Sequence, residues 1–218
     1  SILVVRGKDK VVRAFHNVCS HRGNTLVWEE RGKCPGRFGC GFHGWAYNTE
    51  GELAWVPDEE NFFDLDKSKH GLTPVHCDIW EGFIFIHLAP EPAETLREFL
   101  GGGATQLDGA GFEKMRRLRT YKVEENANYK TALDAQNELY HLPFQHRFTI
   151  GDSFLLKDNK YCRFSNVNLY NYHSVWSCEF NPGHVELPTE GLLHRLDSAL
   201  NDVRMNGRIS DFDWYLIF

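Results

Sequence analysis

Two short stretches that each combine a cysteine, a histidine and glycines constrain this chain more than any other feature. The first reads CSHRG at residues 19–23, and the second reads CGFHGW at residues 40–45. A hydrophobic core favours neither polar imidazoles nor flexible glycines, whereas two loops that enclose a common ligand use both. The spacing therefore predicts two loops between strands that hold one ligand between them.

Thiolate sulfur and imidazole nitrogen together favour zinc or an iron–sulfur cluster. Zinc modules usually keep their two cysteines together and their two histidines together, but here each loop supplies one residue of each kind. That arrangement fits a cluster with both cysteines on one iron and both histidines on the other. The predicted ligands are Cys19, His21, Cys40 and His43. From the residues alone, a structural zinc site and two unrelated pairs within a core stay open as alternatives.

The composition of the chain argues against several classes of protein. Its 218 residues, 42% of them hydrophobic, can bury one large core or two small ones. A net charge of −6 argues against nucleic acid, because phosphate binding needs a basic face. The longest apolar run, GFIFIHLAP from Gly82, is far shorter than the ~18 residues of a membrane span and predicts a buried strand. We therefore expect neither a nucleic-acid nor a membrane partner.

Cysteine usage and the two ends of the sequence add two further expectations. Six cysteines in a long chain without a secretory segment indicate reduced thiols in a cytoplasmic protein. The sequence opens with SILVVRG, which lacks an initiator Met, and closes on DFDWYLIF, and both ends have the pattern of a strand. We therefore expect an internal fragment of a longer protein.

The pattern of the chain changes twice along its length. Residues 1–95 contain short strands separated by turns, including a hairpin turn, NTEG, at 48–51, and predict a small all-β domain. A short helix and several glycines at 96–115 indicate a linker. Residues 116–218 show a strand, a helix, long alternating strands, a second helix (TEGLLHRLDSAL) and a closing strand. The chain is therefore predicted as α+β, with an antiparallel sheet in its second domain.

A second group of potential metal ligands lies on and after a helix predicted at 126–142. Glu138 and His141 fall on one stripe of that helix. Pro143 is expected to end the helix, so that His146 follows on the outgoing turn. Two imidazoles and one carboxylate form the facial triad of a non-haem Fe(II) site. Histidines that cap a helix end or face solvent are the alternative interpretation.

Both groups of residues resemble motifs of one family. CSHRG together with CGFHGWAYNTEG is similar to the Rieske segment of the ring-hydroxylating oxygenases, and NYKTALDAQNELYHLPFQH resembles the catalytic-iron motif of the same family. The resemblance implies an N-terminal all-β Rieske domain with a [2Fe–2S] cluster, followed by a truncated helix-grip catalytic domain. It makes His141 and His146 ligands of a mononuclear Fe(II), with a third, carboxylate ligand outside this chain.

The resemblance gives Glu138 a separate role. In the family, the acid at this position does not bind iron but hydrogen-bonds a Rieske histidine of the neighbouring subunit, here His43, and so links the two metals. A solvated acid on a helix face is the alternative. Tyr129 stands where tryptophan is usual, and Ala135 stands where asparagine is common. Glutamate in place of aspartate at the bridging position is common in family members that oxidise quaternary amines.

By this resemblance the chain is the α (terminal oxygenase) subunit of an enzyme. Electrons from NAD(P)H pass through a reductase, often with a ferredoxin, to the cluster and then to the iron, where O₂ is activated. We expect a dioxygenase of aromatic hydrocarbon catabolism, assembled as a homotrimer or an α3β3 complex. The alternatives are a monooxygenase of quaternary amines or methyl ethers, a Rieske electron carrier without chemistry of its own, and a zinc-stabilised binding module.

Aromatic residues near and after the second group of ligands are candidates for the substrate pocket. An aromatic stripe is more often part of a core, so this assignment is the weaker of the two interpretations. The candidates are Phe144, Phe148, Tyr170, Tyr172 and Trp176.

Overall fold

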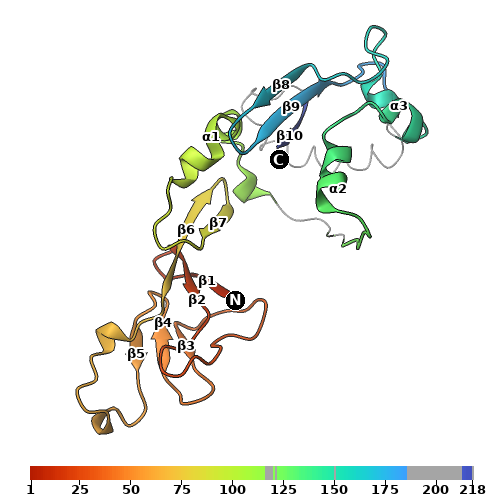
Figure 1. Cartoon of the computed structure of the whole chain (residues 1–218). Coiled ribbons are helices and arrows are strands. Elements are labelled where there is room, and N and C mark those ends of the chain that lie inside the picture. Colours follow the sequence, from red (N-terminus) through yellow and green to blue (C-terminus); the bar gives the residue numbers. More distant parts are fainter. Residues whose placement is uncertain (116–119, 121, 150, 186–212, 218) are drawn as a thin grey trace. The chain divides into compact units, whose positions relative to one another are not determined.

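The computed structural model describes residues 1–115, 120, 122–149, 151–185 and 213–217, which fall into two compact units, Ser1–Thr95 and Leu96–Phe218 (Figure 1). The first unit contains two antiparallel sheets. The larger has the order β1-β2-β6-β7 and consists of β1 (Ile2–Arg6), β2 (Val12–His16), β6 (Pro74–Trp80) and β7 (Phe83–His87). The smaller has the order β3-β4-β5 and consists of β3 (Arg37–Gly39), β4 (Ala46–Asn48) and β5 (Leu53–Trp55).

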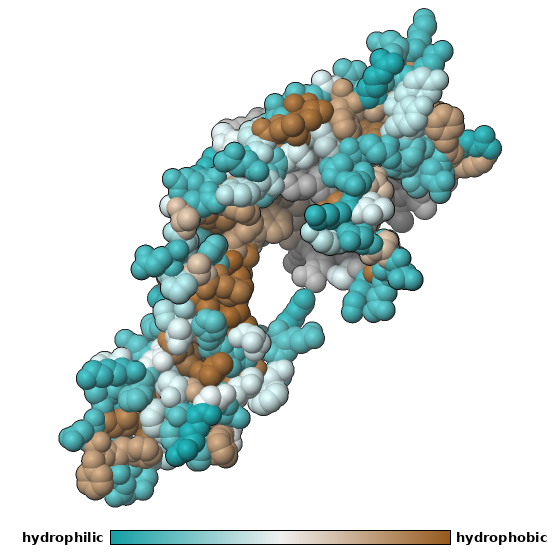
Figure 2. All heavy atoms as spheres, viewed as in Figure 1, coloured by the Kyte–Doolittle hydropathy of each residue, from teal (hydrophilic) through white to brown (hydrophobic). Residues whose placement is uncertain are grey.

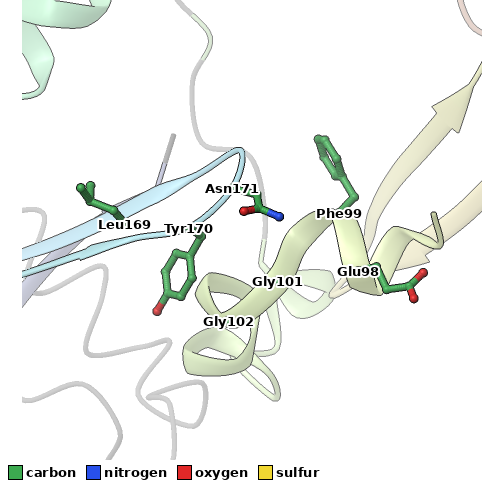
Figure 3. A pocket seen from close by; sticks show the side chains of 7 residues that line it. All are labelled: Glu98, Phe99, Gly101, Gly102, Leu169, Tyr170 and Asn171. Atoms are coloured by element: carbon green, nitrogen blue, oxygen red, sulfur yellow. The ribbon is translucent and has the colours of Figure 1, made fainter. Parts of the chain in front are cut away.

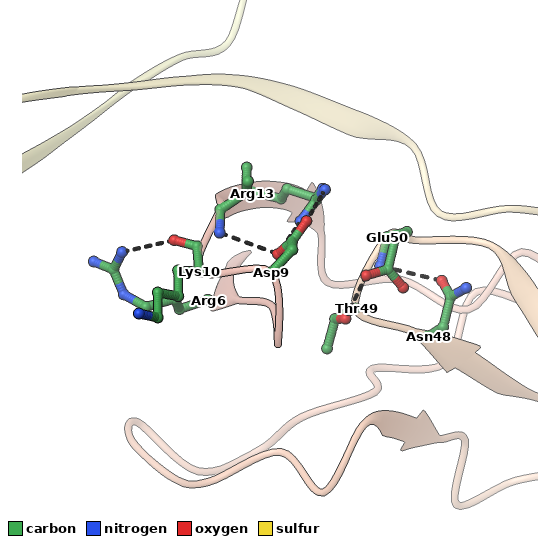
Figure 4. Close-up of polar contacts among 8 residues, drawn as sticks. Arg6, Asp9, Lys10, Arg13, Asn48, Thr49 and Glu50 are labelled. Atoms are coloured by element: carbon green, nitrogen blue, oxygen red, sulfur yellow. Dashed lines mark hydrogen bonds and ion pairs between the residues drawn. The ribbon is translucent and has the colours of Figure 1, made fainter.

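Local polar contacts close two hairpins of the first unit (Figure 4). In the β1–β2 turn, the Asp9 carboxylate accepts two hydrogen bonds from the Arg13 guanidinium, at 2.6 and 3.1 Å. In the β4–β5 turn, Asn48 Oδ1 accepts the backbone N–H groups of Glu50 and Glu52, at 3.1 and 2.8 Å. Asparagine side chains commonly stabilise turns in this way. The hairpin turn predicted at 48–51 is therefore confirmed.

The core of the first unit lies directly beneath the two Cys–His loops. Because β4 is the central strand of its sheet, Tyr47 is fully buried. The core joins strand residues to both loops, and includes Leu3, Phe15, Cys19, Cys40, Trp45, Tyr47 and Leu53. Close packing of these side chains fixes the loops on the sheets.

β7 confirms the strand predicted from Gly82 but not its burial. The strand order places β7 at the edge of the larger sheet, where it pairs with β6 alone among the described strands. Phe83, Ile84 and Ile86 are 53%, 44% and 43% exposed. Figure 2 shows hydrophobic side chains gathered over β6 and β7. An apolar sequence does not reveal whether a strand lies at the centre or the edge of its sheet, and this is why the prediction of burial was wrong.

The second unit combines an antiparallel sheet with helices, and the predicted α+β class is confirmed. Its sheet has the order β10-β9-β8 and consists of β8 (Asn166–Leu169), β9 (Ser174–Glu179) and β10 (Asp213–Ile217). Its helices are α1 (Leu96–Leu107), α2 (Tyr129–Gln136) and α3 (Leu142–Gln145). Single 3-10 turns complete the described elements of both units: η1 (Glu59–Asn61), η2 (Lys67–Lys69), η3 (Phe112–Lys114) and η4 (Gly151–Phe154). None of the described helices has the length and apolarity that crossing a membrane requires.

The glycine-rich segment 96–115, predicted as a linker, contains α1 and η3. α1 bends at Gly101, where φ is 57° and ψ is −152°. Glycine adopts a positive φ without a steric penalty, so these glycines bend a helix here. The second helix predicted for the catalytic domain, at 189–200, lies outside the described residues, and the boundaries predicted between the domains stay a prediction.

The helix predicted at 126–142 is divided into two in the structure. α2 begins after Asn128, whose Oδ1 accepts the Lys130 N–H at 2.9 Å, and its last residue is Gln136, followed by the C-cap residue Asn137. α3 begins five residues later with Pro143 in its first turn, where the missing N–H of proline costs nothing. Pro143 therefore begins a helix, and the prediction that it ends one was wrong.

The break between α2 and α3 contains Glu138 and ends at His141. Glu138 Oε2 accepts the backbone N–H of His141 at 3.1 Å. A side chain that bonds a nearby backbone group in this way competes with the helical hydrogen bond. The sequence predicted that Glu138 and His141 share one face of a helix. In the structure they instead meet in a turn.

Candidate metal centres

The two Cys–His loops close with the same backbone turn. Cys19 follows β2 and Cys40 follows β3, and their side chains are 2% and 4% exposed. In each loop the cysteine carbonyl accepts a 2.9 Å hydrogen bond from the glycine four residues later, Gly23 or Gly44, and both glycines have a φ of 75°. Each cysteine N–H also donates to the carbonyl five residues later, at 2.8 Å. The equal spacing from cysteine to glycine is the sequence signal for this turn, and our prediction did not use it.

The four predicted cluster ligands lie together, with the sulfur atoms inside and the imidazoles outside. The ring centroids of His21 and His43 are 4.7 Å apart. His43 is exposed and His21 is half-buried, while the two thiols lie in the core beneath them. A group held between the loops would therefore contact buried sulfur on one side and accessible imidazole on the other.

The surroundings of these residues favour the protonation states that bind metal. Burial raises the pKa of the Cys40 thiol, but the backbone N–H groups of Phe42 and His43 hydrogen-bond its sulfur, so that its pKa falls below the usual value. Burial lowers the pKa of His21, and the neighbouring His43 lowers it further. The two shifts favour the thiolate of Cys40 and the neutral imidazole of His21, which are the forms that metals bind.

The arrangement of donor atoms fits a two-iron cluster. His21 Nδ1 is buried and has no hydrogen-bond partner among the described residues, a costly state that a bond to metal would relieve. No three of the described His, Cys, Asp and Glu side chains converge on one point. A cluster with two protein ligands on each iron does not require such convergence.

Tyr47 connects the cysteine loop to the core through its hydroxyl. The hydroxyl lies 3.2 Å from Cys19 Sγ and 2.9 Å from Ser20 Oγ, and it accepts the Ser20 N–H at 3.1 Å. Ser20 Oγ donates its own proton to the carbonyl of His70 at 2.6 Å, so the Tyr47 proton can go to Ser20 Oγ or to the sulfur. The pKa of Tyr47 is raised to about 12, mainly by burial, and the phenol therefore keeps this proton.

Trp45 supports His21 from the core side. The two rings are stacked, with centroids 4.6 Å apart and planes 9° from parallel. Trp45 itself is held by edge contacts with Phe62 and His70. Sequence reasoning assigned no part in the site to Tyr47 or Trp45. Both lie close after Cys40, but their contacts depend on how β4 packs under the first loop.

The second group of predicted ligands also meets in the structure. His141 directly precedes α3 and His146 directly follows it. Their ring centroids are 5.3 Å apart, with planes at 66°. The single-turn helix thus brings the two predicted iron ligands side by side, by a route different from the helix and turn that the sequence suggested.

Glu138 contacts His141 with both carboxylate oxygens. Oε2 accepts the His141 N–H, and Oε1 pairs with His141 Nδ1. Partial burial raises the pKa of Glu138, but the hydrogen bonds from His141 outweigh it and lower the pKa below the usual value. An ionised carboxylate at Nδ1 directs the other ring nitrogen, Nε2, toward a metal.

The five aromatic candidates for the substrate pocket lie in different surroundings. Phe144, Phe148 and Tyr172 are 63%, 81% and 58% exposed, whereas Trp176 is buried and stacks on Phe164. Tyr170 is the one candidate that lines the pocket of about 360 Å³ beside α1 shown in Figure 3. That pocket is lined by Glu98, Phe99, Gly101, Gly102, Leu169, Tyr170 and Asn171. The burial of Trp176 agrees with the core interpretation for that residue, and a shared substrate pocket stays a prediction.

Comparison with known proteins agrees with the geometry of the two loops. Residues 1–75 match the family model of the Rieske [2Fe-2S] domain. The chain carries a Rieske [2Fe–2S] domain. The predicted cluster cofactor is thereby confirmed, and the zinc-binding alternative is set aside.

The similarity to Rieske oxygenase subunits extends beyond this domain. The carnitine monooxygenase oxygenase subunit of Escherichia coli (strain K12) is 36% identical over 142 residues, which are 65% of this chain and 38% of the relative. The 2-aminobenzenesulfonate 2,3-dioxygenase subunit alpha of an Alcaligenes species is 34% identical over 144 residues, 64% of this chain and 36% of the relative. The chain is thus homologous to Rieske oxygenase subunits and spans well under half of their length.

A solved structure shows the same relationship in three dimensions. The quaternary ammonium Rieske monooxygenase CntA, in complex with an inhibitor, aligns with a TM-score of 0.68 and 27% identity. The alignment covers 83% of this chain and 48% of CntA, so it includes parts of both units. The predicted Rieske domain followed by a sheet-containing second domain is therefore confirmed at the level of the fold.

Proposed function

We propose that this Rieske chain is part of the terminal oxygenase subunit of a monooxygenase that acts on a quaternary amine. The observation that carries the proposal is the grouping of Glu138, His141 and His146 around α3 in a chain that also holds a Rieske domain. The similarity to a carnitine monooxygenase subunit and to CntA supports the substrate class. Glutamate at position 138 supports it too, because this residue is common in family members that oxidise quaternary amines. An aromatic dioxygenase is the second candidate, supported by the similarity to a dioxygenase subunit.

Four residues of the first unit would hold the cluster: Cys19, Cys40, His21 and His43. A bound [2Fe–2S] cluster supplies one-electron transfer. The backbone N–H groups of Phe42 and His43 stabilise the Cys40 thiolate, and Trp45 holds the plane of the His21 ring. The hydroxyl of Tyr47 places its proton at Cys19 Sγ once that sulfur is a thiolate, because a charged acceptor attracts the proton more strongly than Ser20 Oγ does.

In the second unit, His141 and His146 would hold a mononuclear Fe(II), with a third, carboxylate ligand outside this chain. A bound Fe(II) with open positions supplies O₂ activation. Glu138 fixes the orientation of His141 and is still 43% exposed, so that its carboxylate is accessible to a second histidine. His43 is exposed on the first unit, and we propose that His43 of a neighbouring subunit is that histidine.

The partners follow from this electron path. We propose a homotrimer or an α3β3 assembly, because Glu138 would join two subunits. A reductase, with or without a ferredoxin, would supply electrons from NAD(P)H. All six cysteines are free, which supports a reducing compartment such as the cytoplasm.

Metal and sulfide content tests the proposed class of protein. We expect three irons and two acid-labile sulfides per chain in full-length protein purified without oxygen. Two irons and two sulfides that do not change on addition of Fe(II) would instead indicate an electron carrier. Zinc without sulfide would refute the proposed cofactors.

Product formation tests the proposed substrate class. With NADH, reductase and O₂, we expect conversion of carnitine or glycine betaine and little conversion of naphthalene. Coupled hydroxylation of naphthalene without any reaction of the quaternary amines would overturn the substrate class and favour the dioxygenase. A matched control is the same assay without added Fe(II) after removal of the mononuclear iron with a chelator, which should abolish both activities.

A further inference from the structure

A polar network fastens the segment after His146 to the end of β9. It joins Asp152 and Ser153 of η4 to His184, about thirty residues later in the chain. His184 Nδ1 lies 3.0 Å from Asp152 Oδ1, and Ser153 Oγ lies 3.4 Å from His184 Nε2. The side chain of His184 is 2% exposed and Ser153 is 3% exposed, so water does not compete for the contact between them, whereas the Asp152 side chain is 58% exposed and its carboxylate also meets solvent.

When His184 is neutral, the protons of this network have one arrangement. A carboxylate only accepts hydrogen bonds, so His184 Nδ1 carries the ring proton and donates it to Asp152. His184 Nε2 then accepts the hydroxyl proton of Ser153. The order Asp–His–Ser is that of a hydrolase triad, but a serine that is 3% exposed does not meet a substrate. The network therefore holds structure in place.

Asn181 strengthens the same junction from the end of β9. Its backbone N–H donates to the Ser153 carbonyl at 2.6 Å, and its side-chain Nδ2 donates to the Asp152 carbonyl at 2.9 Å. The rings of Phe154 and Phe180 also meet edge to face, with centroids 5.9 Å apart. η4 is thus bound to the strand end through backbone, side chains and ring packing.

The position of His146 depends on the structure packed around α3, because α3 has only four residues and such a short helix is not stable alone. α3 packs against η4. The His146 carbonyl accepts hydrogen bonds from Thr149 N–H at 3.0 Å and from Thr149 Oγ1 at 3.1 Å. The backbone of His146 is therefore held to the segment that leads into η4, and η4 is held by the network.

We propose that Asp152, Ser153 and His184 are positioning residues that keep His146 in place to bind Fe(II). The inference rests on the proposed function, in which His146 is an iron ligand. Partners outside the direct ligands typically change metal affinity by about 10–100-fold when they are removed. We expect loss of this network to weaken Fe(II) binding about tenfold, the lower end of that range, because its contact with the ligand is indirect.

The test compares Asp152→Ala with Asp152→Asn in the full-length protein. The amide oxygen of asparagine still accepts the His184 Nδ1 proton, so Asp152→Asn should bind Fe(II) nearly as well as the wild type. Asp158→Ala, an exposed aspartate six residues later, is the matched control. The readouts are the chelator concentration that removes half of the mononuclear Fe(II), and the electron paramagnetic resonance spectrum of its nitric oxide complex.

We expect Asp152→Ala to lose iron at about tenfold lower chelator concentration and to alter the nitric oxide spectrum, with the visible absorbance of the Rieske cluster unchanged. Equal iron retention in Asp152→Ala, Asp158→Ala and the wild type would overturn the positioning role alone. A wild type that retains no mononuclear iron would overturn the proposed function and the positioning role together. If Asp152→Ala does not fold, Ser153→Ala decides by the same readouts, because it removes only the hydroxyl that His184 accepts.

Discussion

Replacing Tyr47 by phenylalanine removes one buried hydroxyl and keeps the ring. The hydroxyl contacts Cys19 Sγ and Ser20 Oγ and accepts the Ser20 N–H. Ser20 Oγ keeps its hydrogen bond to the His70 carbonyl. The Ser20 N–H loses the hydrogen-bond partner that the structure gives it, and the sulfur of Cys19 loses its hydroxyl donor.

The expected cost follows from these losses. Ser20 is exposed and its bond to Tyr47 is only part-buried, so the loss is that of an ordinary hydrogen bond, about 0.5–1.5 kcal/mol, and we expect the free energy of unfolding to fall by about 1 kcal/mol. The lost donor also matters more when the cluster is reduced and its sulfur atoms carry more negative charge. A difference of about 1 kcal/mol between the two redox states lowers a one-electron reduction potential by roughly 40 mV.

Urea unfolding measures the first effect, and a potentiometric titration followed by the visible absorbance of the cluster measures the second. Tyr129→Phe is the control, because Tyr129 is 68% exposed and its loss should change the unfolding free energy by less than about 0.5 kcal/mol. Tyr47→Phe with both an unchanged unfolding free energy and an unchanged potential would refute the role of this hydroxyl.

Three further predictions rest on single contacts. Gly44→Ala should lower the unfolding free energy by about 1–2 kcal/mol more than Gly23→Ala. Both have a φ of 75°, but only the added Cβ at Gly44 meets Pro57, at 2.9 Å, and equal losses in a thermal melt would contradict this reasoning. Asn48→Ala should cost about 1 kcal/mol through loss of the turn, measured by urea unfolding, and a cost near zero would speak against it. Glu138→Gln should retain both metals but slow single-turnover oxidation of the cluster strongly, whereas Glu125→Gln should not; unchanged turnover in Glu138→Gln would exclude the bridging role.

The parts of the fold that depend on neighbours in sequence were predictable. The hairpin turn at 48–51 is made by hydrogen bonds of Asn48 to residues two and four positions later. The two Cys–His loops are closed within five residues of each cysteine. Short-range contacts of this kind leave a pattern of residue types at fixed spacing: the spacing of cysteine and histidine was enough to find the two pairs, and the spacing of cysteine and glycine would also have predicted the shared turn.

The parts that depend on distant residues or on competing local contacts were not predictable from pattern alone. The contact of Tyr47 with Cys19 spans 28 residues and exists because β4 packs beneath the first loop. The exposure of β7 follows from its place at the edge of the sheet. The break after α2 depends on Glu138 accepting the His141 N–H. Helical periodicity does not show that a side chain competes with the helix for this N–H group.

The two Cys–His loops share one backbone turn but carry their histidines at different positions. Both loops have the same hydrogen bonds from cysteine to glycine, yet the histidine is the second residue after Cys19 and the third after Cys40. The same backbone turn thus accommodates a histidine either two or three residues after the cysteine. We therefore expect that each histidine can be moved by one position, through paired substitutions at residues 21 and 22 or at residues 42 and 43, without loss of the turn, provided that Gly23 and Gly44 are retained.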